Sequence, residues 1–198
     1  MDTRFSPRSH ADLIRLIADH PLAWVVSQDF QATPLPLIAE TDMSGAIVSL
    51  LGHFARRNPQ VAAFQGNPHG LILFQGPQGY ISPRLVSRPA WAPTWNYAVI
   101  RFEVTVSFVP DETDAAVRRL AAHLEHERRD PWHVEEMGNR YGQLQQHIIA
   151  FHAHVRATHA TFKLGQDEDR GTFEEIVAGL GEVPLASWML QQRCLTPR

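Results

Sequence analysis

The clearest pattern in the chain is an alternation of apolar and mostly polar residues between Ala98 and Phe108. Six apolar side chains occupy every second position of this segment, and Arg101 and Glu103 lie between them. Because successive side chains of a strand point to opposite faces of a sheet, the spacing predicts a long strand with one buried face. The segment 150–164 alternates in the same way and predicts another strand.

Shorter apolar runs, separated by turn residues, predict further strands upstream. These strands are expected at 22–26, 33–38, 46–51, 61–65 and 71–75. Runs this close together favour antiparallel pairing into a barrel or a sandwich. Capping residues and a helical spacing of apolar residues predict helices elsewhere. The helices are expected at about 9–20, 111–129, 138–149, 172–180 and 186–193.

The composition is that of an ordinary globular domain. The chain has 198 residues, of which 44% are hydrophobic and 20% are charged. A chain of this length can bury a sizeable hydrophobic core without disulfides or bound metals to stabilise it. The one cysteine, Cys194, can form no internal disulfide, and the charged first residues lack the apolar run of a signal peptide. No run approaches the ~20 apolar residues of a membrane span. These features predict a cytoplasmic protein without a membrane segment.

The charge balance argues against an autonomous DNA-binding surface. The net charge is -3, and the basic residues are almost all Arg spread through the chain, with Lys163 as the only lysine. Tight DNA binding needs a basic stripe that neutralises successive phosphates, and no helix-turn-helix pattern is recognisable. We therefore expect no tight DNA binding by the chain alone.

Pairs of histidines are the first candidates for chemistry. His152 and His154 lie on one face of a predicted strand, and His123 and His126 lie three apart on a predicted helix. Neither pair belongs to an HExxH or paired-cysteine pattern, so no metal site is predicted. The GxSxG, Walker A and GxGxxG fingerprints are also missing from the sequence, which removes the simplest hydrolase, NTPase and Rossmann interpretations.

The stretch GHFARRNP suits a phosphate better than any other part of the chain. It follows a predicted strand that ends at Leu51, and it predicts a short helix that starts near Gly52 and His53. The free N–H groups of a helix N-terminus and a nearby cation such as Arg56 favour an anion. The alternative is that Arg56 and Arg57 are simply solvated.

Two later windows, GPQGYISP (76–83) and APTWNY (92–97), combine turn formers with aromatic and amide side chains. They predict either packed loops or loops that line a site for a flat molecule. An aromatic slot with a polar edge would be supplied by Tyr80 and Trp95 together with hydroxyl and amide groups.

Four motifs, LLGHFARRNPQ, LILFQGPQGYISP, APTWNY and FKLGQ, occur in this order. The set resembles the PaiB-type, FMN-binding negative transcriptional regulators, which belong to the pyridoxamine-phosphate-oxidase-like split-barrel flavoproteins. The resemblance implies an α+β fold, namely a six-stranded antiparallel Greek-key split barrel with flanking helices. It implies one domain over 1–198 with a helical insertion at about 111–149. It also implies a homodimer, with FMN in a cleft that both subunits build.

On this resemblance, one group of residues would hold the FMN phosphate and another would face the flavin ring. The predicted cofactor-binding residues are Gly52, His53, Arg56, Tyr80, Ser82, Trp95, Asn96 and Lys163. The first three form the phosphate group, the next four form the ring group, and the lysine approaches from the last strand.

The chain departs from the family pattern near both groups. Leu85 and Val86 stand where the family usually has Trp-Tyr, Gly165 and Asp167 replace the Ser and Asn of a KLSQN-like motif, and Pro34 occupies a strand where related oxidases place an Arg. Three functions stay open: a flavin-binding regulator that acts on DNA or through a protein partner, an FMN-dependent oxidoreductase, and a split-barrel protein that has lost FMN. The sequence does not decide whether the protein is an enzyme.

Overall fold

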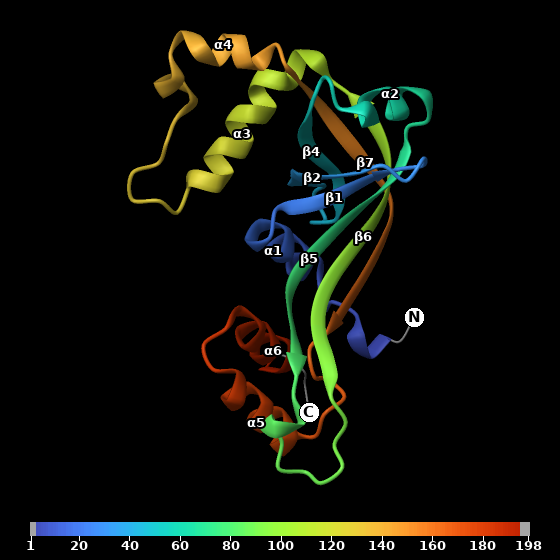
Figure 1. Ribbon diagram of the computed structural model, residues 1–198, viewed down its shortest axis with the longest axis vertical. Helices are drawn as coiled ribbons and strands as arrows, with labels where there is room; N and C mark the ends of the chain where they lie inside the picture. Colours follow the sequence, from blue (N-terminus) through green and yellow to red (C-terminus); the bar gives the residue numbers. More distant parts are fainter. Residues whose placement is uncertain (1–2, 195–198) are drawn as a thin grey trace.

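The computed structural model describes residues 3–194, and its centre is one antiparallel sheet of seven strands (Figure 1). The strands are β1 (Leu22–Ser27), β2 (Ala32–Pro36), β3 (Ile38–Thr41), β4 (Ile47–Ala55), β5 (His69–Ile81), β6 (Thr94–Phe108) and β7 (Ile148–Lys163). They lie in the order β2-β1-β5-β6-β7-β4-β3. The α+β class is confirmed, but the predicted number of six strands is wrong.

The two edges of this sheet are consecutive in the chain. Strand β2 pairs with β1 and strand β3 pairs with β4, yet only Leu37 separates β2 from β3. The edges must therefore meet at Leu37, and the sheet curves into a barrel. The segment that the sequence predicted as one strand, 33–38, is divided at this residue, which accounts for the seventh strand.

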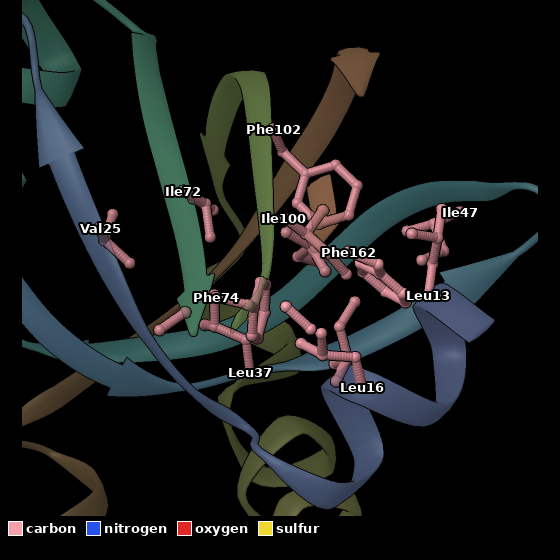
Figure 2. Close-up of a cluster of buried hydrophobic side chains, with 14 of the residues drawn as sticks. Leu13, Leu16, Val25, Leu37, Ile47, Ile72, Phe74, Ile100, Phe102 and Phe162 are labelled. Carbon is pink, nitrogen blue, oxygen red and sulfur yellow. The ribbon is translucent and has the colours of Figure 1, made fainter. Parts of the chain in front are cut away.

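The barrel interior contains the alternating residues of the long strands. Phe102 on β6 and Phe162 on β7 are fully buried, as the period of two predicts. Helix α1 (His10–Asp19) adds Leu13 and Leu16 to the same cluster, beside Ile47 (Figure 2). Burying each large apolar side chain stabilises the fold by about 1.5 to 3 kcal/mol. This core fixes the strands that position every candidate residue.

The predicted strand at 61–65 is wrong, because this segment is helix α2 (Pro59–Gly66). Asn58 caps the helix by accepting a hydrogen bond from the N–H of Gln60 at 2.9 Å, and Pro59 occupies the first position. A capping Asn followed by Pro is a helix-start signal. A short apolar run without alternation does not distinguish a strand from a buried helix.

Two helical regions flank the barrel. Residues 110–145, here called the helical lobe, contain η3 (Pro110–Glu112), α3 (Thr113–Glu125), η4 (Val134–Met137) and α4 (Asn139–Gln145). The lobe covers the outer face of β4 and β7 with a small apolar contact that includes Leu51, Ala116 and Ala150. Helices α5 (Arg170–Leu180) and α6 (Pro184–Cys194) pack at the other end of the long strands (Figure 1).

Short 3-10 turns complete the described chain at η1 (Thr3–Phe5) and η2 (Pro83–Leu85). Within residues 3–194, no helix has the length and apolar character needed to cross a membrane.

Candidate functional site

The predicted helix start at Gly52 and His53 is wrong, because strand β4 continues through both residues to Ala55. The strand continues because β7 pairs with it: Gly52 lies opposite Phe151, and His53 lies opposite Ala150. These residues therefore offer no free helical N–H groups to a phosphate.

Gly52 is needed for packing. A side-chain carbon at this position would lie 2.3 Å from Cδ2 of Leu37 and 3.3 Å from the ring of Phe151. Both neighbours are fully buried in the barrel core, and atoms cannot approach so closely without displacement. The absent side chain makes room for Leu37, the residue that joins the two sheet edges.

His53 points away from the barrel interior. Its neighbours Leu50 and Phe54 belong to the main core, whereas Leu51, on the same face as His53, packs under the helical lobe. Burial lowers the pKa of His53, so the imidazole is neutral at pH 7. Its Nδ1 atom is buried and has no hydrogen-bond partner among the described residues.

The helix N-terminus near this corner belongs to α2, which begins after the turn that contains Arg56 and Arg57 and is capped by Asn58. Both arginines are exposed, and neither forms an ion pair within residues 3–194. The N–H of Arg56 donates to the carbonyl of His147 at 2.8 Å, which fixes the turn beside the start of β7. Two unpaired cations beside a helix N-terminus suit an anionic group.

Buried amides hold α2 against the β1–β2 hairpin. The side chain of Asn58 donates to Oγ1 of Thr33 at 3.0 Å. Gln60 is 1% exposed, and its Nε2 donates to the carbonyls of Val25 and Gln31, both at 3.0 Å, and approaches Oγ of Ser27 at 3.3 Å. Its Oε1 has no partner in the described chain. We call Arg56–Gln60 and these hairpin contacts the α2 corner.

Tyr80, Trp95 and Asn96 of the second predicted group lie on strands β5 and β6, so the prediction of loops is wrong for them. Tyr80 and Trp95 are directly opposite each other on β5 and β6, with ring centroids 6.0 Å apart. Both are about half exposed, at 52% and 51%. Nε1 of Trp95 donates to Oε1 of Gln78 at 2.6 Å. A cross-strand aromatic pair of this kind presents a flat apolar surface with a polar edge.

Lys163 lies next to this pair. It pairs with Tyr97 across β6 and β7, and its Nζ donates to the carbonyl of Trp95 at 3.2 Å and to Oγ1 of Thr94. The structure thus brings Tyr80, Trp95 and Lys163 together. We call residues 78–82 and 94–97, with Lys163, the aromatic end.

Asn96 and Ser82 are oriented differently from the aromatic pair. Asn96 is 1% exposed and its Nδ2 points to Sδ of Met189 on α6, 3.6 Å away. It therefore lies on the opposite face of β6 from Trp95. Oγ of Ser82 accepts a hydrogen bond from the N–H of Arg84 at 3.2 Å and caps η2.

The α2 corner and the aromatic end are far apart within one chain. His53 lies opposite Ala150 of β7, and Tyr97 lies opposite Lys163 of the same strand. The interval 150–163 corresponds to about 43 Å of strand at about 3.3 Å per residue, much longer than an FMN molecule. Figure 1 shows α2 at the top and the far end of β5 at the bottom. One FMN cannot contact both groups of a single chain.

Three departures from the family motifs have a structural reason. Gly165 has φ +84°, a left-handed conformation that glycine adopts without strain. Leu85 packs against α5, where a side-chain carbon on Gly179 would lie 2.7 Å from its Cδ2. Pro34 lies on β2, an edge strand, and edge strands tolerate proline.

An apolar groove of about 650 Å³ adjoins the aromatic end through Gln78. Trp24 of β1, Pro77 of β5 and Leu185 of α6 line it, among others. Metal chemistry has no support, since no group of three His, Cys, Asp or Glu side chains is arranged around a common point in residues 3–194.

Some residues that shape the site were not predicted as part of it. Gln60, the last residue of the motif LLGHFARRNPQ, and Gln78 are not among the predicted cofactor-binding residues. A polar residue within the first turn of a helix, after an Asn-Pro cap, is the signal that would have identified Gln60.

Comparisons with known proteins identify the family. Residues 1–157 match the family model described as "Putative FMN-binding domain". The chain is also 28% identical over 133 residues to "Protease synthase and sporulation protein PAI 2" of Bacillus subtilis (strain 168), an alignment that covers 66% of this chain. It spans 64% of the length of that relative.

Solved structures support the fold. The chain is similar to the FAD and heme binding protein from Mycobacterium smegmatis, with a TM-score of 0.62, 17% identity and coverage of 87% of this chain and 79% of that one. The flavocytochrome Anf3 from Azotobacter vinelandii gives a TM-score of 0.53 and 15% identity over 82% of this chain and 74% of that one. Since the family model covers most of the sequence, the chain belongs to the FMN-binding domain family that its PaiB-like motifs predicted, and FMN is its cofactor.

Proposed function

We propose that the protein is an FMN-binding regulator of the PaiB type that works as a homodimer in the cytoplasm. In each FMN site, the phosphate lies at the α2 corner of one copy and the flavin ring lies against the aromatic end of the other. The separation of the two groups along β7 carries this proposal. A dimer with two equivalent sites brings together what one chain keeps apart.

The exposed side chains of the sheet support a dimer. Trp24 is 51% exposed and lies opposite Leu73, which is 37% exposed, on the outer face of β1 and β5. Tyr80 and Trp95 extend this apolar surface along β5 and β6. An apolar surface on this scale is typical of an interface. We expect the dimer to bury on the order of 2,000 Å² or more.

The α2 corner fits the phosphate of FMN. Arg56 and Arg57 supply positive charge that no described carboxylate neutralises, and they lie beside the N-terminal end of α2, where the helix dipole favours an anion. When bound, FMN supplies redox chemistry, and this chain supplies its binding and orientation.

Regulation through a protein partner agrees better with the charge than direct DNA binding does. The net charge is -3, and several arginines of the helical lobe are already paired, as in Arg118 with Asp114 and Arg119 with Glu40. These two arginines are therefore less able to neutralise DNA phosphates. The relative from Bacillus subtilis is named as a sporulation protein, which is in keeping with regulation.

FMN titration by fluorescence quenching tests the site. Losing one charge-assisted contact costs about 1.5 to 3 kcal/mol, so Arg56→Ala should weaken FMN binding roughly tenfold to a hundredfold. Trp95→Ala should also weaken binding. Arg140→Ala, an exposed arginine on α4, is the matched control and should bind as the wild type does.

Mixing the two damaged proteins tests whether the site is shared. A mixed dimer of Arg56→Ala and Trp95→Ala chains would contain one intact site and one doubly damaged site, so mixing should restore tight FMN binding to part of the protein. If each site lay within one chain, every site in the mixed dimer would still carry one defect. Unrestored binding in confirmed mixed dimers would therefore overturn the shared site.

A further inference from the structure

The apolar groove beside the aromatic end lies where β5 loses a neighbouring strand. Strand β1 pairs with β5 only as far as Phe74, whereas β5 continues to Ile81. Helix α6 packs beside this extension (Figure 1), and a side-chain carbon on Gly79 would lie 3.0 Å from Cδ2 of Leu185. The groove, of about 650 Å³, therefore occupies the space between the start of β1, the extension of β5 and the helix.

Strand β5 is irregular where it borders the groove. Between Gln75 and Gln78, three steps along β5 lie opposite two steps along β6, from Val99 to Tyr97. The extra residue makes a β-bulge, and bulges are frequent beside functional sites. Residues three apart on a regular strand point to opposite faces, but here both glutamines are exposed and both line the groove.

The open edge of β5 does not suit an added strand. Pro77 lies on this edge and has no N–H to donate to a neighbour. The bulge at the same place interrupts regular pairing. Since both features protect an edge from pairing with another chain, a small molecule fits the groove better than an extended peptide does.

The lining determines the chemistry of the ligand. Among the described residues that line the groove there is no Asp, Glu, Lys or Arg, so a charged ligand would lose its hydration without gaining an opposite charge. Leu22 is 60% exposed, and Trp24 and Val183 also leave apolar surface uncovered there. An uncharged molecule with an aromatic ring, which can stack on the indole of Trp24, satisfies this lining.

Gln78 supplies a polar contact at the edge of the groove. Its Oε1 accepts the N–H of the Trp95 indole at 2.6 Å, and its Nε2 has no hydrogen bond within residues 3–194. The two N–H groups of this amide can donate to a carbonyl, hydroxyl or ether oxygen. An oxygen acceptor at one end of the ligand would therefore fix its orientation.

We propose that this groove is a binding site for a small, uncharged aromatic molecule that carries an oxygen acceptor. The ring lies against Trp24, and the acceptor meets Gln78. The volume falls within the range of about 300 to 1,000 Å³ that is typical of small-molecule sites. The groove is formed within a single chain, so binding does not depend on the FMN site shared between two copies.

Two fluorescent naphthalene probes test the site. Prodan is neutral and carries a ketone, whereas anilinonaphthalene sulfonate carries a permanent negative charge. We expect wild type to bind Prodan with a Kd of about 10 µM and the sulfonate at least about tenfold more weakly. Because His20 also lines the groove, the titrations are done at about pH 8, where an ordinary histidine is neutral. No Prodan binding, or equal binding of the two probes, would overturn the proposal.

Variants locate the probe in the groove. Val183→Asp adds a charge to the lining and should weaken Prodan binding about tenfold. The carbonyl of Val183 accepts the N–H of Ala186 at the start of α6, a position where Asp is favoured, so this variant should fold. Leu190→Asp, an exposed position on α6 outside the lining, is the matched control and should bind as the wild type does. Equal affinities of these two variants would contradict the site. Gln78→Leu removes the donor and should shift the emission of bound Prodan to shorter wavelengths.

A second copy of the chain is the alternative occupant, because Trp24 also belongs to the proposed dimer surface. Sedimentation velocity with saturating Prodan distinguishes the two. We expect one probe per chain and no change in association, whereas dissociation of the dimer by Prodan would show that the partner fills the groove and would overturn the proposal. Prodan binding to a monomeric wild type would support the groove while refuting the shared FMN site.

Discussion

The α2 corner and the aromatic end lie at opposite ends of the same long sheet. They differ in the burial of their side chains and in the contacts that those side chains make. At the corner, Gln60 is 1% exposed and its amide bonds within the chain. At the aromatic end, Tyr80 and Trp95 are about half exposed and contact mainly each other. The amide nitrogen of Gln60 is bonded within one chain, whereas the aromatic end has apolar surface left for a second molecule.

This difference separates stability from assembly. A buried polar group that loses its partners costs folding free energy, so changes at the corner should destabilise the monomer. A half-exposed aromatic pair contributes little to the fold and much to an interface, so changes at the aromatic end should weaken the dimer. The experiments below test this division, beginning with the largest expected effect.

Gln60→Met should lower the free energy of unfolding by about 3 kcal/mol. Methionine has a similar size but cannot donate the hydrogen bonds that Gln60 gives to the carbonyls of Val25 and Gln31. Urea unfolding measures the change. Gln65→Met, an exposed position on the same helix, is the control and should change stability by less than about 0.5 kcal/mol. Equal effects of the two substitutions would show that the corner network is not stabilising.

Trp95→Ala should weaken dimer association by about 2 kcal/mol, which is roughly thirtyfold in the dissociation constant. The monomer should lose less than about 1 kcal/mol, because the Tyr80 pair is exposed. Sedimentation velocity over a dilution series measures association. Met43→Ala, a fully exposed residue outside the proposed interface, should leave association unchanged. A wild-type protein that sediments as a monomer at micromolar concentration would refute the dimer.

Ser82→Ala should cost about 0.5 to 1 kcal/mol of stability, since the hydroxyl caps η2. Ser82→Asn, which keeps a capping oxygen, should recover most of the loss. We expect both variants to bind FMN as the wild type does. A tenfold loss of FMN affinity in Ser82→Ala alone would instead place the hydroxyl against the cofactor, as the sequence predicted.

The smallest effect concerns Asp29 in the β1–β2 turn. Hydrogen bonds from the side chains of Ser27 and Gln31 lower its pKa. Because the pKa of Asp29 is lower in the folded state, its carboxylate stabilises the hairpin at pH values above 3.8, the pKa of an unperturbed Asp. This stabilisation is lost as pH falls through the pKa of the folded state. Urea unfolding between about pH 6 and about pH 3 should show a shallower loss for Asp29→Asn than for the wild type. Parallel curves would mean that Asp29 contributes nothing.

The sequence predicted those elements whose signals are local. Alternation over 98–108 and 150–164 located β6 and β7. Capping residues and apolar spacing predicted the helix at about 9–20, and in α1 the Asp12 carboxylate accepts the N–H of Ser9 at 3.2 Å. The acidic first turn of α3 was equally informative. These patterns depend on neighbours within a few residues, so no tertiary information was needed.

The errors lie where distant partners decide the structure. The sequence predicted a helix start at Gly52 and His53. In the structure both residues belong to β4, because they pair with β7, which lies about a hundred residues later in the chain. The sequence predicted a turn at Gly76 and Pro77. In the structure β5 continues through both residues, and its register with β6 shifts between Gln75 and Gln78. Pairing between remote strands is not visible in a window of ten residues.

The motifs identified the family but not the shape of its site. Each predicted cofactor residue was chosen from its own short stretch, and nothing in the sequence measured the distance between stretches. The register of β7 supplied that distance, and the proposal of a site shared between two copies rests on it.

The single-residue joint at Leu37 also has a consequence for how the chain is made. Its two flanking strands need β1 on one side and β4 on the other, and β4 in turn needs β7, which ends at Lys163. A ribosome must therefore release the chain as far as β7 before the barrel can close. Until then, the edges of the early strands stay unpaired and exposed. We therefore expect the nascent chain to bind chaperones.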